Sequence, residues 1–433
     1  MKNISNIFLK KRILVYGLGK SGLSTLRFLQ NKSEVYAYDD FTDKLKSQSL
    51  KKKIIKLNRI FSLNFDQIIL SPGIDINSCK LSNYLKKNKN KIFTDLDVFY
   101  SFNKNFCITI TGTNGKSTTC QLLYEVLLNQ RFDVRLAGNI GNPVLSVKNV
   151  NQKTIFIIEA SSYQLEYSKI FKSKFAAILN LSPDHIERHK TLNKYVKSKF
   201  KLLKNQNNNN LAFVKKNDLL ITKELKKNKF KSKIIKVDNK KTKKYLKDLD
   251  NEYFLTETNK ENLSFVIEIS KRLKIDNNIL KKTLKKFKGL KYRQQIIFKN
   301  KYLTIINDSK STSFSSSVGL LKTNQNIYWL IGGIHKKDDK LLLSKRYYKN
   351  IKAFIYGKNK NFFNKNLNKK VSIENFNNLK DALKKIFKII KKHKKNHKTI
   401  LFSPCAASFD NFKNFEDRGS YFNKLVKRHL NGI

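Results

Sequence analysis

Acidic residues, cysteine and long apolar runs are all scarce in this chain of 433 residues, which has 32 Asp and Glu against 90 Lys and Arg. Its four cysteines form no CxxC pair, a usage typical of reduced thiols in a cytoplasmic protein. No run approaches the roughly 18 apolar residues that span a bilayer, and the N-terminus lacks a signal-peptide pattern. We therefore expect a cytoplasmic protein without a membrane span.

A formal net charge of +58 is the first sign by which nucleic-acid-binding proteins are recognised. Such proteins gather their basic residues on one face, whereas here lysine is spread from end to end. Hydrophobic residues make up 40% of the chain and aromatic residues 12%, which excludes a disordered chain. We interpret the charge as chain-wide compositional drift that leaves a solvated lysine coat, with no specific nucleic-acid partner. A basic nucleic-acid-binding protein remains the alternative.

Glycine (15) and proline (4) are also few, so their positions are informative. Ten of the glycines and all four prolines lie in or just beyond short loops that follow apolar runs, as in Ser71-Pro72-Gly73, Gly138-Asn139-Ile140-Gly141, Ser182-Pro183-Asp184 and Ser403-Pro404-Cys405. Ligands of open α/β sheets bind at the carboxyl ends of the strands. These loops therefore predict a ligand-binding rim.

Apolar, strand-like runs alternate with helical stretches along the whole chain. We predict strands at 12–16, 34–38, 67–70, 108–111, 154–158, 176–180, 302–306, 328–331, 353–356 and 399–402. Between the last two we predict an amphipathic helix near 379–390, and we interpret 391–398 as its solvated basic end. The alternation favours an α/β protein of three domains, 1–95, 96–292 and 293–433, each with a mainly parallel sheet flanked by helices.

Two glycine-rich loops are typical of phosphate binding. Gly17-Leu18-Gly19-Lys20-Ser21-Gly22 fits GxGxxG between a strand and a helix, with Asp39-Asp40 ending the next strand. This pattern predicts a diphosphate held by backbone amides and a helix N-terminus, although a plain tight turn would look alike. The stronger signal is Thr111-Gly112-Thr113-Asn114-Gly115-Lys116-Ser117-Thr118, a short P-loop in which Lys116 neutralises phosphates and Ser117 ligates Mg²⁺.

Two later segments carry candidate metal and acid–base groups. Glu159 ends the strand before Ala160-Ser161-Ser162-Tyr163-Gln164, the position at which a P-loop enzyme places a second Mg²⁺ ligand. Ser182-Pro183-Asp184-His185 ends another strand, with His189 four residues later. A hydrogen-bonded loop would explain the Asp-His pair equally well at this point.

Together the GTNGKST loop, the Glu-x-Ser-Ser-aromatic-Gln segment and the SPDH-x-x-RH segment resemble the Mur ligases of peptidoglycan synthesis. The GLGKSG and SPGI loops, residues 307–312 and residues 403–416 make the resemblance strongest to the members that add D-glutamate to UDP-N-acetylmuramoyl-L-alanine. It spans all three domains, and it implies a Rossmann-like UDP-sugar domain, a P-loop ATPase-like central domain and a Rossmann-like amino-acid domain. It also implies ATP, Mg²⁺ and an acyl-phosphate intermediate, in a chain that we expect to be monomeric.

The resemblance assigns residues to each ligand by position. The UDP-sugar would bind to Gly17, Gly19, Lys20, Ser21, Gly22, Asp39, Ser71, Gly73 and Asn139. ATP would bind to Gly112, Thr113, Asn114, Gly115, Lys116, Ser117, Thr118, Asn259, Asn262, Arg293 and Asp308. D-Glutamate would meet Lys310, Thr312, Lys336, Ser408 and Phe415, whose two cations suit a dianionic amino acid.

The catalytic set implied by the resemblance is Lys116, Glu159, His185 and Lys199, and the metal ligands are Ser117, Glu159, His185 and a carbamylated Lys199. Carbamylation converts a cation into an anionic oxygen ligand, which suits Mg²⁺. The choice of Lys199 rests on register alone, and Lys197 and Lys201 compete with it.

The chain departs from the family pattern at four places: Tyr292 stands for a His, Thr258 begins a segment expected to start with His, Ile334-His335 replaces Asp-Gly, and Ser313 replaces Asn. These changes affect the adenine side and the domain-closing contacts. Rival functions explain less. An NAD-dependent oxidoreductase would not explain the P-loop. A GTPase would need a base-reading Asn-Lys-x-Asp segment, which this sequence does not contain. A folylpolyglutamate synthetase-like ligase shares the chemistry and is the nearest alternative.

Overall fold

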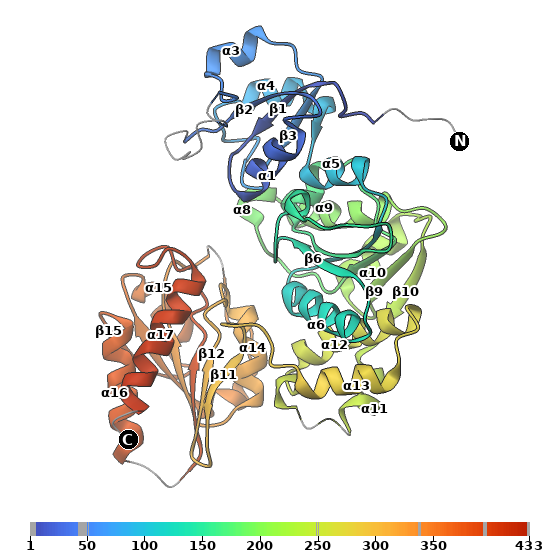
Figure 1. Ribbon diagram of the computed structural model, residues 1–433. Helices are drawn as coiled ribbons and strands as arrows, with labels where there is room; N and C mark the ends of the chain where they lie inside the picture. Colours follow the sequence, from blue (N-terminus) through green and yellow to red (C-terminus); the bar gives the residue numbers. More distant parts are fainter. Residues whose placement is uncertain are drawn as a thin grey trace. The chain divides into compact units, whose positions relative to one another are not determined.

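Short apolar runs separated by helical stretches form the strands of three sheets, each flanked by helices (Figure 1). The computed structural model describes residues 6–41, 50, 52–247, 249, 251–336, 339–392 and 396–430. The chain divides into two compact units, Met1–Lys247 with Glu261–Thr283 and Asp248–Lys260 with Leu284–Ile433. The first unit holds two sheets and the second holds one, so the predicted α/β class with three mainly parallel sheets is confirmed.

The first sheet is all parallel, in the order β2-β1-β3-β4. Its strands are β1 (Arg12–Tyr16), β2 (Glu34–Tyr38), β3 (Gln67–Leu70) and β4 (Ile92–Phe93), and its helices are α1 (Lys20–Leu29), α3 (Leu57–Ser62) and α4 (Ser82–Lys87). Helix α5 (Asp95–Phe102) leads into the next sheet and begins at a capping box made by Thr94 and Asp97.

The second sheet is also all parallel, in the order β10-β9-β8-β5-β7-β6. Its strands are β5 (Phe106–Thr111), β6 (Val134–Gly138), β7 (Ile155–Glu159), β8 (Phe175–Ile178), β9 (Leu211–Lys215) and β10 (Lys233–Val237). The helices are α6 (Lys116–Asn129), α7 (Ser162–Tyr167), α8 (Ile186–His189), α9 (Leu192–Lys204), α10 (Leu219–Lys227), α11 (Lys243–Leu246), α12 (Glu257–Arg272) and α13 (Asn277–Lys286).

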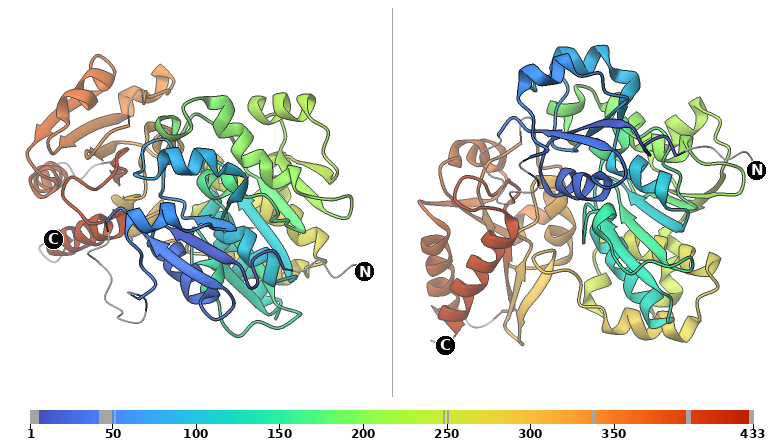
Figure 2. Two further views of the ribbon diagram at one scale, coloured as in Figure 1. Left: turned by 90° about the horizontal axis from the view of Figure 1, so that it is seen from above. Right: turned by 45° about the horizontal axis from the view of Figure 1, so that its top comes forward.

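The third sheet has the order β11-β12-β16-β13-β14-β15, with only β11 antiparallel to its neighbour. Its strands are β11 (Gln295–Lys299), β12 (Leu303–Asn307), β13 (Ile327–Ile331), β14 (Ile351–Tyr356), β15 (Ser372–Phe376) and β16 (Lys398–Phe402). Helices α16 (Leu379–Lys392) and α17 (Phe415–Leu430) lie together against one face, and α14 (Phe314–Thr323) and α15 (Lys360–Leu367) cover the other (Figure 2).

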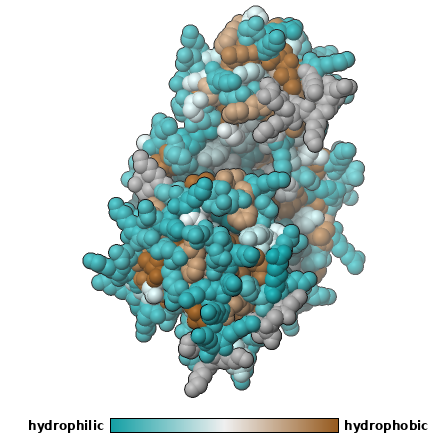
Figure 3. Space-filling model, turned by 90° about the vertical axis from the view of Figure 1, so that its left-hand side faces the viewer, coloured by the Kyte–Doolittle hydropathy of each residue, from teal (hydrophilic) through white to brown (hydrophobic). Residues whose placement is uncertain are grey.

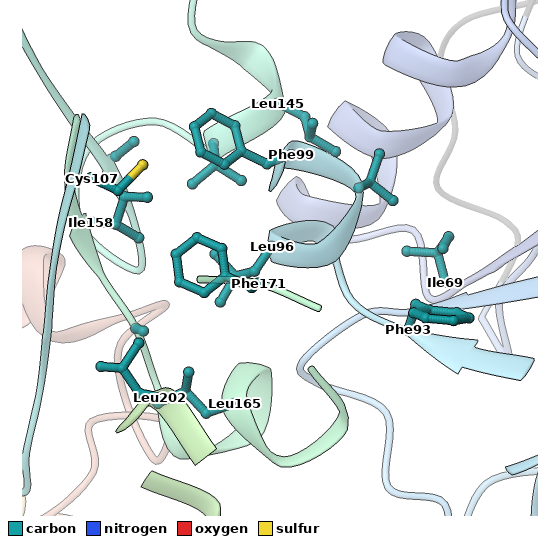
Figure 4. Packing of buried hydrophobic residues seen from close by; sticks show 14 of the residues in the cluster. Ile69, Phe93, Leu96, Phe99, Cys107, Leu145, Ile158, Leu165, Phe171 and Leu202 are labelled. Carbon is teal, nitrogen blue, oxygen red and sulfur yellow. The ribbon is translucent and has the colours of Figure 1, made fainter. Parts of the chain in front are cut away.

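One continuous apolar core joins the first two sheets. Figure 4 shows Leu96 and Phe99 of α5 in this core, between Ile69 and Phe93 of the first sheet and Ile158 of the second. The rings of Phe99 and Phe156 meet edge to face at 4.9 Å between centroids, a favourable aromatic geometry. The first two sheets therefore share a core and form one unit.

The helix predicted near 379–390 is confirmed as α16, but the interpretation of 391–398 as its solvated end is wrong in part. Lys398 begins the buried strand β16 and is only 8% exposed, while residues 393–395 lie outside the described part. Pairing with β12 requires this strand to start at Lys398, because Leu303 is its register partner. An interpretation based on charge alone therefore placed Lys398 in a helix end, although it belongs to a strand.

The face drawn in Figure 3 is mostly hydrophilic, and its apolar residues form small separate groups. No disulfide joins the four cysteines, all of which lie in the described part of the chain, in agreement with the expected reduced thiols. Among the helices of the described residues, none combines the length and the apolar character that crossing a membrane requires.

Candidate active site

The P-loop connects β5 to α6 at the carboxyl end of the second sheet. Gly115 caps α6 with φ of 84°, and a Cβ there would lie 2.0 Å from Asn262 Oδ1 of α12, so this close contact requires glycine. Asn180, in the loop after the neighbouring strand β8, holds the P-loop in place, because it accepts from the Asn114 amide at 2.8 Å and donates to the Asn114 carbonyl at 3.2 Å. The amides that would hold phosphates therefore have a fixed frame.

Two lysines converge on one backbone carbonyl of this loop. Lys116 Nζ donates to Gly112 O at 2.9 Å and to Thr113 O at 2.8 Å. Lys199 Nζ, from α9, donates to the same Gly112 O at 2.8 Å and lies near Thr111 Oγ1 at 3.4 Å. Burial, and then the charge of Lys116, hold the pKa of Lys199 well below its ordinary value. The buried amine is therefore disposed to be neutral.

Geometry separates Lys199 from its two sequence competitors. Lys197 is exposed on the opposite face of α9, and the Lys201 ammonium donates to the Glu166 carbonyl, away from the P-loop. Lys199 is 2% exposed and alone of the three contacts the phosphate loop. Of the three lysines, the one that the resemblance assigned is therefore the one at the P-loop.

Glu159 ends β7 beside these lysines and is 1% exposed. Its Oε1 accepts from Asn139 Nδ2 at 2.7 Å, whereas its buried Oε2 has no hydrogen-bond partner among the described residues. A buried carboxylate oxygen without a donor is costly, and a bound cation would satisfy it. Glu159 therefore fits the predicted role of a magnesium ligand, and Asn139 of the UDP-sugar set is its direct neighbour.

His185 stands in a left-handed conformation, with φ of 54°, at the start of α8. Its Nδ1 is 2.8 Å from the Tyr163 hydroxyl, and its Nε2 is 3.4 Å from Asp184 Oδ2. No group of three or more His, Cys, Asp or Glu side chains suited to a metal occurs in the described ranges, so the predicted metal set depends on Ser117 and Lys199 as well.

The GxGxxG loop follows β1 and opens α1, with Gly19 as N-cap. A Cβ on Gly22 would lie 1.8 Å from Gly17 O, so the turn is closed by glycine at that position. Asp39 accepts from the Leu18 amide at 2.5 Å, and Ser71 Oγ donates to Gly17 O at 2.6 Å. The predicted UDP-sugar residues of three strands therefore form one connected rim.

Gly19 and Gly73 leave open space on this rim, since no described heavy atom lies within 4 Å of a Cβ built on either. Lys20 and Ser21 follow Gly19 in the first turn of α1, and Lys20 is exposed. A helix N-terminus with a cation beside it attracts a diphosphate. The local geometry thus fits the predicted ligand class.

The predicted D-glutamate residues all belong to the second unit, on loops after β12, β13 and β16 and at the start of α17. Lys310 Nζ lies 4.1 Å from the centroid of Phe415, and Arg293 also faces that ring at 5.6 Å. Two backbone bonds join Ile334 to Ala407, at 3.0 and 2.8 Å, which bring the Lys336 loop to the Ser408 loop. The set is therefore assembled by three neighbouring strands.

Arg418, to which the sequence reasoning gave no role, holds these loops together. It is 1% exposed and donates to Ser309 O at 2.7 Å, to Ala406 O at 2.9 Å and to Ser309 Oγ at 3.1 Å. Only its proximity to Phe415 in the sequence could have indicated it. Tyr163, Arg188 and Asn180 were missed in the same way, although the first two lie inside the recognised motifs.

The residues expected around ATP fall in both units. Asn262 belongs to the first unit with the P-loop, whereas Asn259, Arg293 and Asp308 belong to the second. Asn259 donates to Gln294 Oε1 at 3.0 Å, and the Gln294 amide donates to Asp308 Oδ1 at 3.1 Å. Gln294 therefore links Asn259 to Asp308 by hydrogen bonds within the second unit.

Two family departures are occupied by packed rings. Tyr292 lies against Gly419 of α17, where a Cβ would be 2.4 Å from Tyr292 Cδ1. His335 stacks on Phe362 with 3.8 Å between ring centroids. Both substitutions thus have structural partners in the second unit.

Asp308 provides a prediction on stability. Burial raises the pKa of Asp308 to about 7, partly opposed by the hydrogen bond from Ser403 Oγ at 2.7 Å. When the pKa of a carboxyl is higher in the folded than in the unfolded protein, the free energy of unfolding falls as the pH rises from the unfolded-state pKa to the folded-state pKa. Relative to Asp308→Asn, the wild type should lose about 3 kcal/mol of unfolding free energy between pH 5 and pH 8. Urea unfolding of both proteins at the two pH values measures this, and equal pH dependence would contradict it.

Two family models match the chain. Residues 11–92 match the MurD-like N-terminal domain of Mur ligases, and residues 110–283 match the Mur ligase middle domain. The UDP-N-acetylmuramoylalanine–D-glutamate ligase of Rickettsia felis is 33% identical over 452 residues, 99% of each chain. The ligase of the same name from Francisella tularensis subsp. novicida is 31% identical over 423 residues, 96% of this chain and 95% of the relative.

Solved structures share the fold. UDP-N-acetylmuramate–alanine ligase MurC from Thermotoga maritima is similar with a TM-score of 0.54 and 15% identity, covering 98% of this chain and 100% of that one. MurF ligase from the same organism, crystallised with ADP, has a TM-score of 0.55 and 13% identity, covering 99% and 100%.

Proposed function

Because this chain belongs to the Mur ligase family, we propose that it uses ATP to join D-glutamate to UDP-N-acetylmuramoyl-L-alanine. It is an ATP-dependent ligase of peptidoglycan precursor synthesis, as its full-length similarity to D-glutamate ligases indicates. The observation that carries the chemistry is the meeting of Lys116 and Lys199 on the Gly112 carbonyl, next to a buried Glu159. This arrangement suits the transfer of a phosphoryl group.

The reaction must first activate a carboxylate, which is a poor electrophile at neutral pH. The L-alanyl carboxylate attacks the γ-phosphate of ATP while Lys116 neutralises the developing charge, giving an acyl phosphate and ADP. The amine of D-glutamate then attacks the acyl carbon, phosphate leaves, and an amide forms. Closing of the amino-acid domain over ATP would keep water from the acyl phosphate.

Two magnesium sites complete the proposal. Ser117 and Glu159 would hold one ion, and His185 with a carbamylated Lys199 would hold the other. Bound Mg²⁺ supplies positive charge that stabilises the phosphoryl group in transfer. The lowered pKa of Lys199 supports carbamylation, since only a neutral amine attacks CO₂.

Substrate recognition divides between the domains. The rim of Gly17, Ser21, Asp39 and Ser71 would hold the UDP moiety, with Lys20 at the diphosphate. In the last domain, residues 293–433, Lys310 and Lys336 would bind the two carboxylates of D-glutamate, and Thr312, Ser408 and Phe415 would complete that pocket. The remaining proposals are the boundaries 1–95 and 96–292, a monomeric state and a cytoplasmic location.

Phosphate release from ATP tests the function. We expect release only when UDP-N-acetylmuramoyl-L-alanine and D-glutamate are both present, and none above background with L-glutamate. Equal release with L-glutamate would support an ATP-dependent ligase but contradict the proposed specificity for D-glutamate. Release with a folate and L-glutamate instead would favour the folylpolyglutamate synthetase-like alternative.

A further inference from the structure

Arg188 of α8 contacts the loop that follows β3 through hydrogen-bonding and charged groups. Its side chain is only 10% exposed, its Nη2 donates to the Ile74 carbonyl, and its Nε lies 3.6 Å from Asp75 Oδ1. Ile74 in turn packs on the first phosphate loop, because a Cβ on Gly17 would lie 2.8 Å from Ile74 Cγ1. One guanidinium, only 10% exposed, therefore joins α8 to the loop beside the first phosphate loop.

The guanidinium carbon Cζ of Arg188 lies over the ring of Tyr163, 5.0 Å from the ring centroid. The Tyr163 ring is 4.9 Å from the ring of His185, and its hydroxyl is 2.8 Å from His185 Nδ1. Tyr163 therefore sits between Arg188 and a proposed metal ligand.

A second contact path leads from Tyr163 to the P-loop. The Tyr163 ring stacks on His189 at 5.5 Å, and His189 meets the ring of Tyr195 at 5.4 Å. The Tyr195 hydroxyl is 2.9 Å from Thr113 Oγ1 in the P-loop. All of these residues lie in the first unit, whose two sheets are joined by a shared apolar cluster.

We propose that Arg188 is a positioning residue that couples UDP-sugar binding to the ATP and metal site. This inference rests on the proposed function of the two loops. A ligand that orders the loop after β3 would also order the Arg188 guanidinium. Tyr163, which packs on that guanidinium, and His185, which contacts Tyr163, would then be ordered as well. Arginine suits this role because its planar group donates at its edge while its face stacks on an aromatic ring. Coupling of this kind is reciprocal, so each ligand strengthens binding of the other.

Binding measurements test the proposal without turnover. Calorimetry gives the affinity for a non-hydrolysable ATP analogue with Mg²⁺, alone and with saturating UDP-N-acetylmuramoyl-L-alanine. In the wild type we expect the UDP-sugar to tighten analogue binding by about tenfold. In Arg188→Met and Arg188→Lys this factor should fall to near one, while both ligands still bind separately. Lysine keeps the charge but not the planar group, so it separates stacking from charge.

Two further variants define the path and the background. Tyr163→Leu removes the aromatic face and should lose the same coupling, with no added loss in the double variant with Arg188→Met. Arg12→Met is the matched control, since Arg12 forms a surface ion pair with Glu34 at 3.0 Å and should leave the coupling intact.

Three results would overturn the role of Arg188: a wild type without coupling, full coupling in both Arg188 variants, or a parallel loss of both separate affinities and of the melting temperature. The last result would assign Arg188 a merely structural role. A wild type that shows coupling but releases no phosphate with D-glutamate would contradict the proposed reaction and still support this inference.

Discussion

Replacing Lys199 with alanine is expected to lower D-glutamate-dependent phosphate release by about a thousandfold, the upper range for loss of one preorganised electrostatic group. Lys199 Nζ lies 2.8 Å from the Gly112 carbonyl in a fully buried position beside Lys116 and Glu159. As a carbamate it would replace a cation by an anionic metal ligand, so its removal takes away charge and ligand together. Steady-state phosphate release with both substrates saturating measures the effect.

Lys197→Ala is the matched control, because Lys197 is on the same helix, two residues earlier, and exposed. It should retain wild-type activity. Protein equilibrated with ¹³C-labelled bicarbonate should give one carbamate carbon resonance that Lys197→Ala keeps and Lys199→Ala loses. A signal that disappears only in Lys201→Ala, or full activity in Lys199→Ala, would refute the assignment.

Substitution of Lys116 by methionine should lower the same activity by a similar factor, about a thousandfold. The Lys116 ammonium closes the P-loop through Gly112 O and Thr113 O, at 2.9 and 2.8 Å, and would also face the transferred phosphoryl group. Methionine keeps much of the side-chain length without the charge. Binding of an ATP analogue, read as a rise in melting temperature, should weaken in the variant while binding of the UDP-sugar persists.

Lys153→Met serves as the control for lost charge, since Lys153 is exposed in the turn before β7 and should show no change. If Lys116→Met kept its rate while losing analogue binding, Lys116 would contribute to ground-state affinity and not to the transition state. If the UDP-sugar affinity fell together with the analogue affinity, a folding defect would account for the loss.

Most strands with buried apolar runs were predictable, because their composition is distinctive. β1, β2 and β3 begin and end where their apolar runs do, and β12 and β16 are buried along their whole length. The strands that were not predicted are five at sheet edges, β4, β6, β10, β11 and β15, and the interior strand β9. In the edge strand β10, with the sequence KIIKV, only Val237 is fully buried and both lysines are exposed, so its apolar pattern is weak.

The candidate site was predictable where ligand binding by a loop requires particular residue types in a fixed order. The P-loop needs glycines, a lysine and a hydroxyl in one order, so Gly112, Lys116 and Ser117 could be named from their spacing. Side chains that support the site follow no such order. Arg418 and Arg188 are two of many basic residues in this chain, and only burial separates them from the solvated ones.

The sequence by itself determined the three α/β sheets, the two phosphate loops and the family. The alternation of strand-like and helical stretches and the positions of the glycines can both be read from short segments of the sequence. The tertiary structure alone decided which lysine of α9 reaches the P-loop, since Lys197, Lys199 and Lys201 are equivalent in composition. Helical geometry turns Lys199 toward Gly112 and into the core, where burial lowers its pKa, while Lys197 faces solvent. Contacts between distant segments, such as Arg188 with Ile74, likewise exist only once the chain has packed.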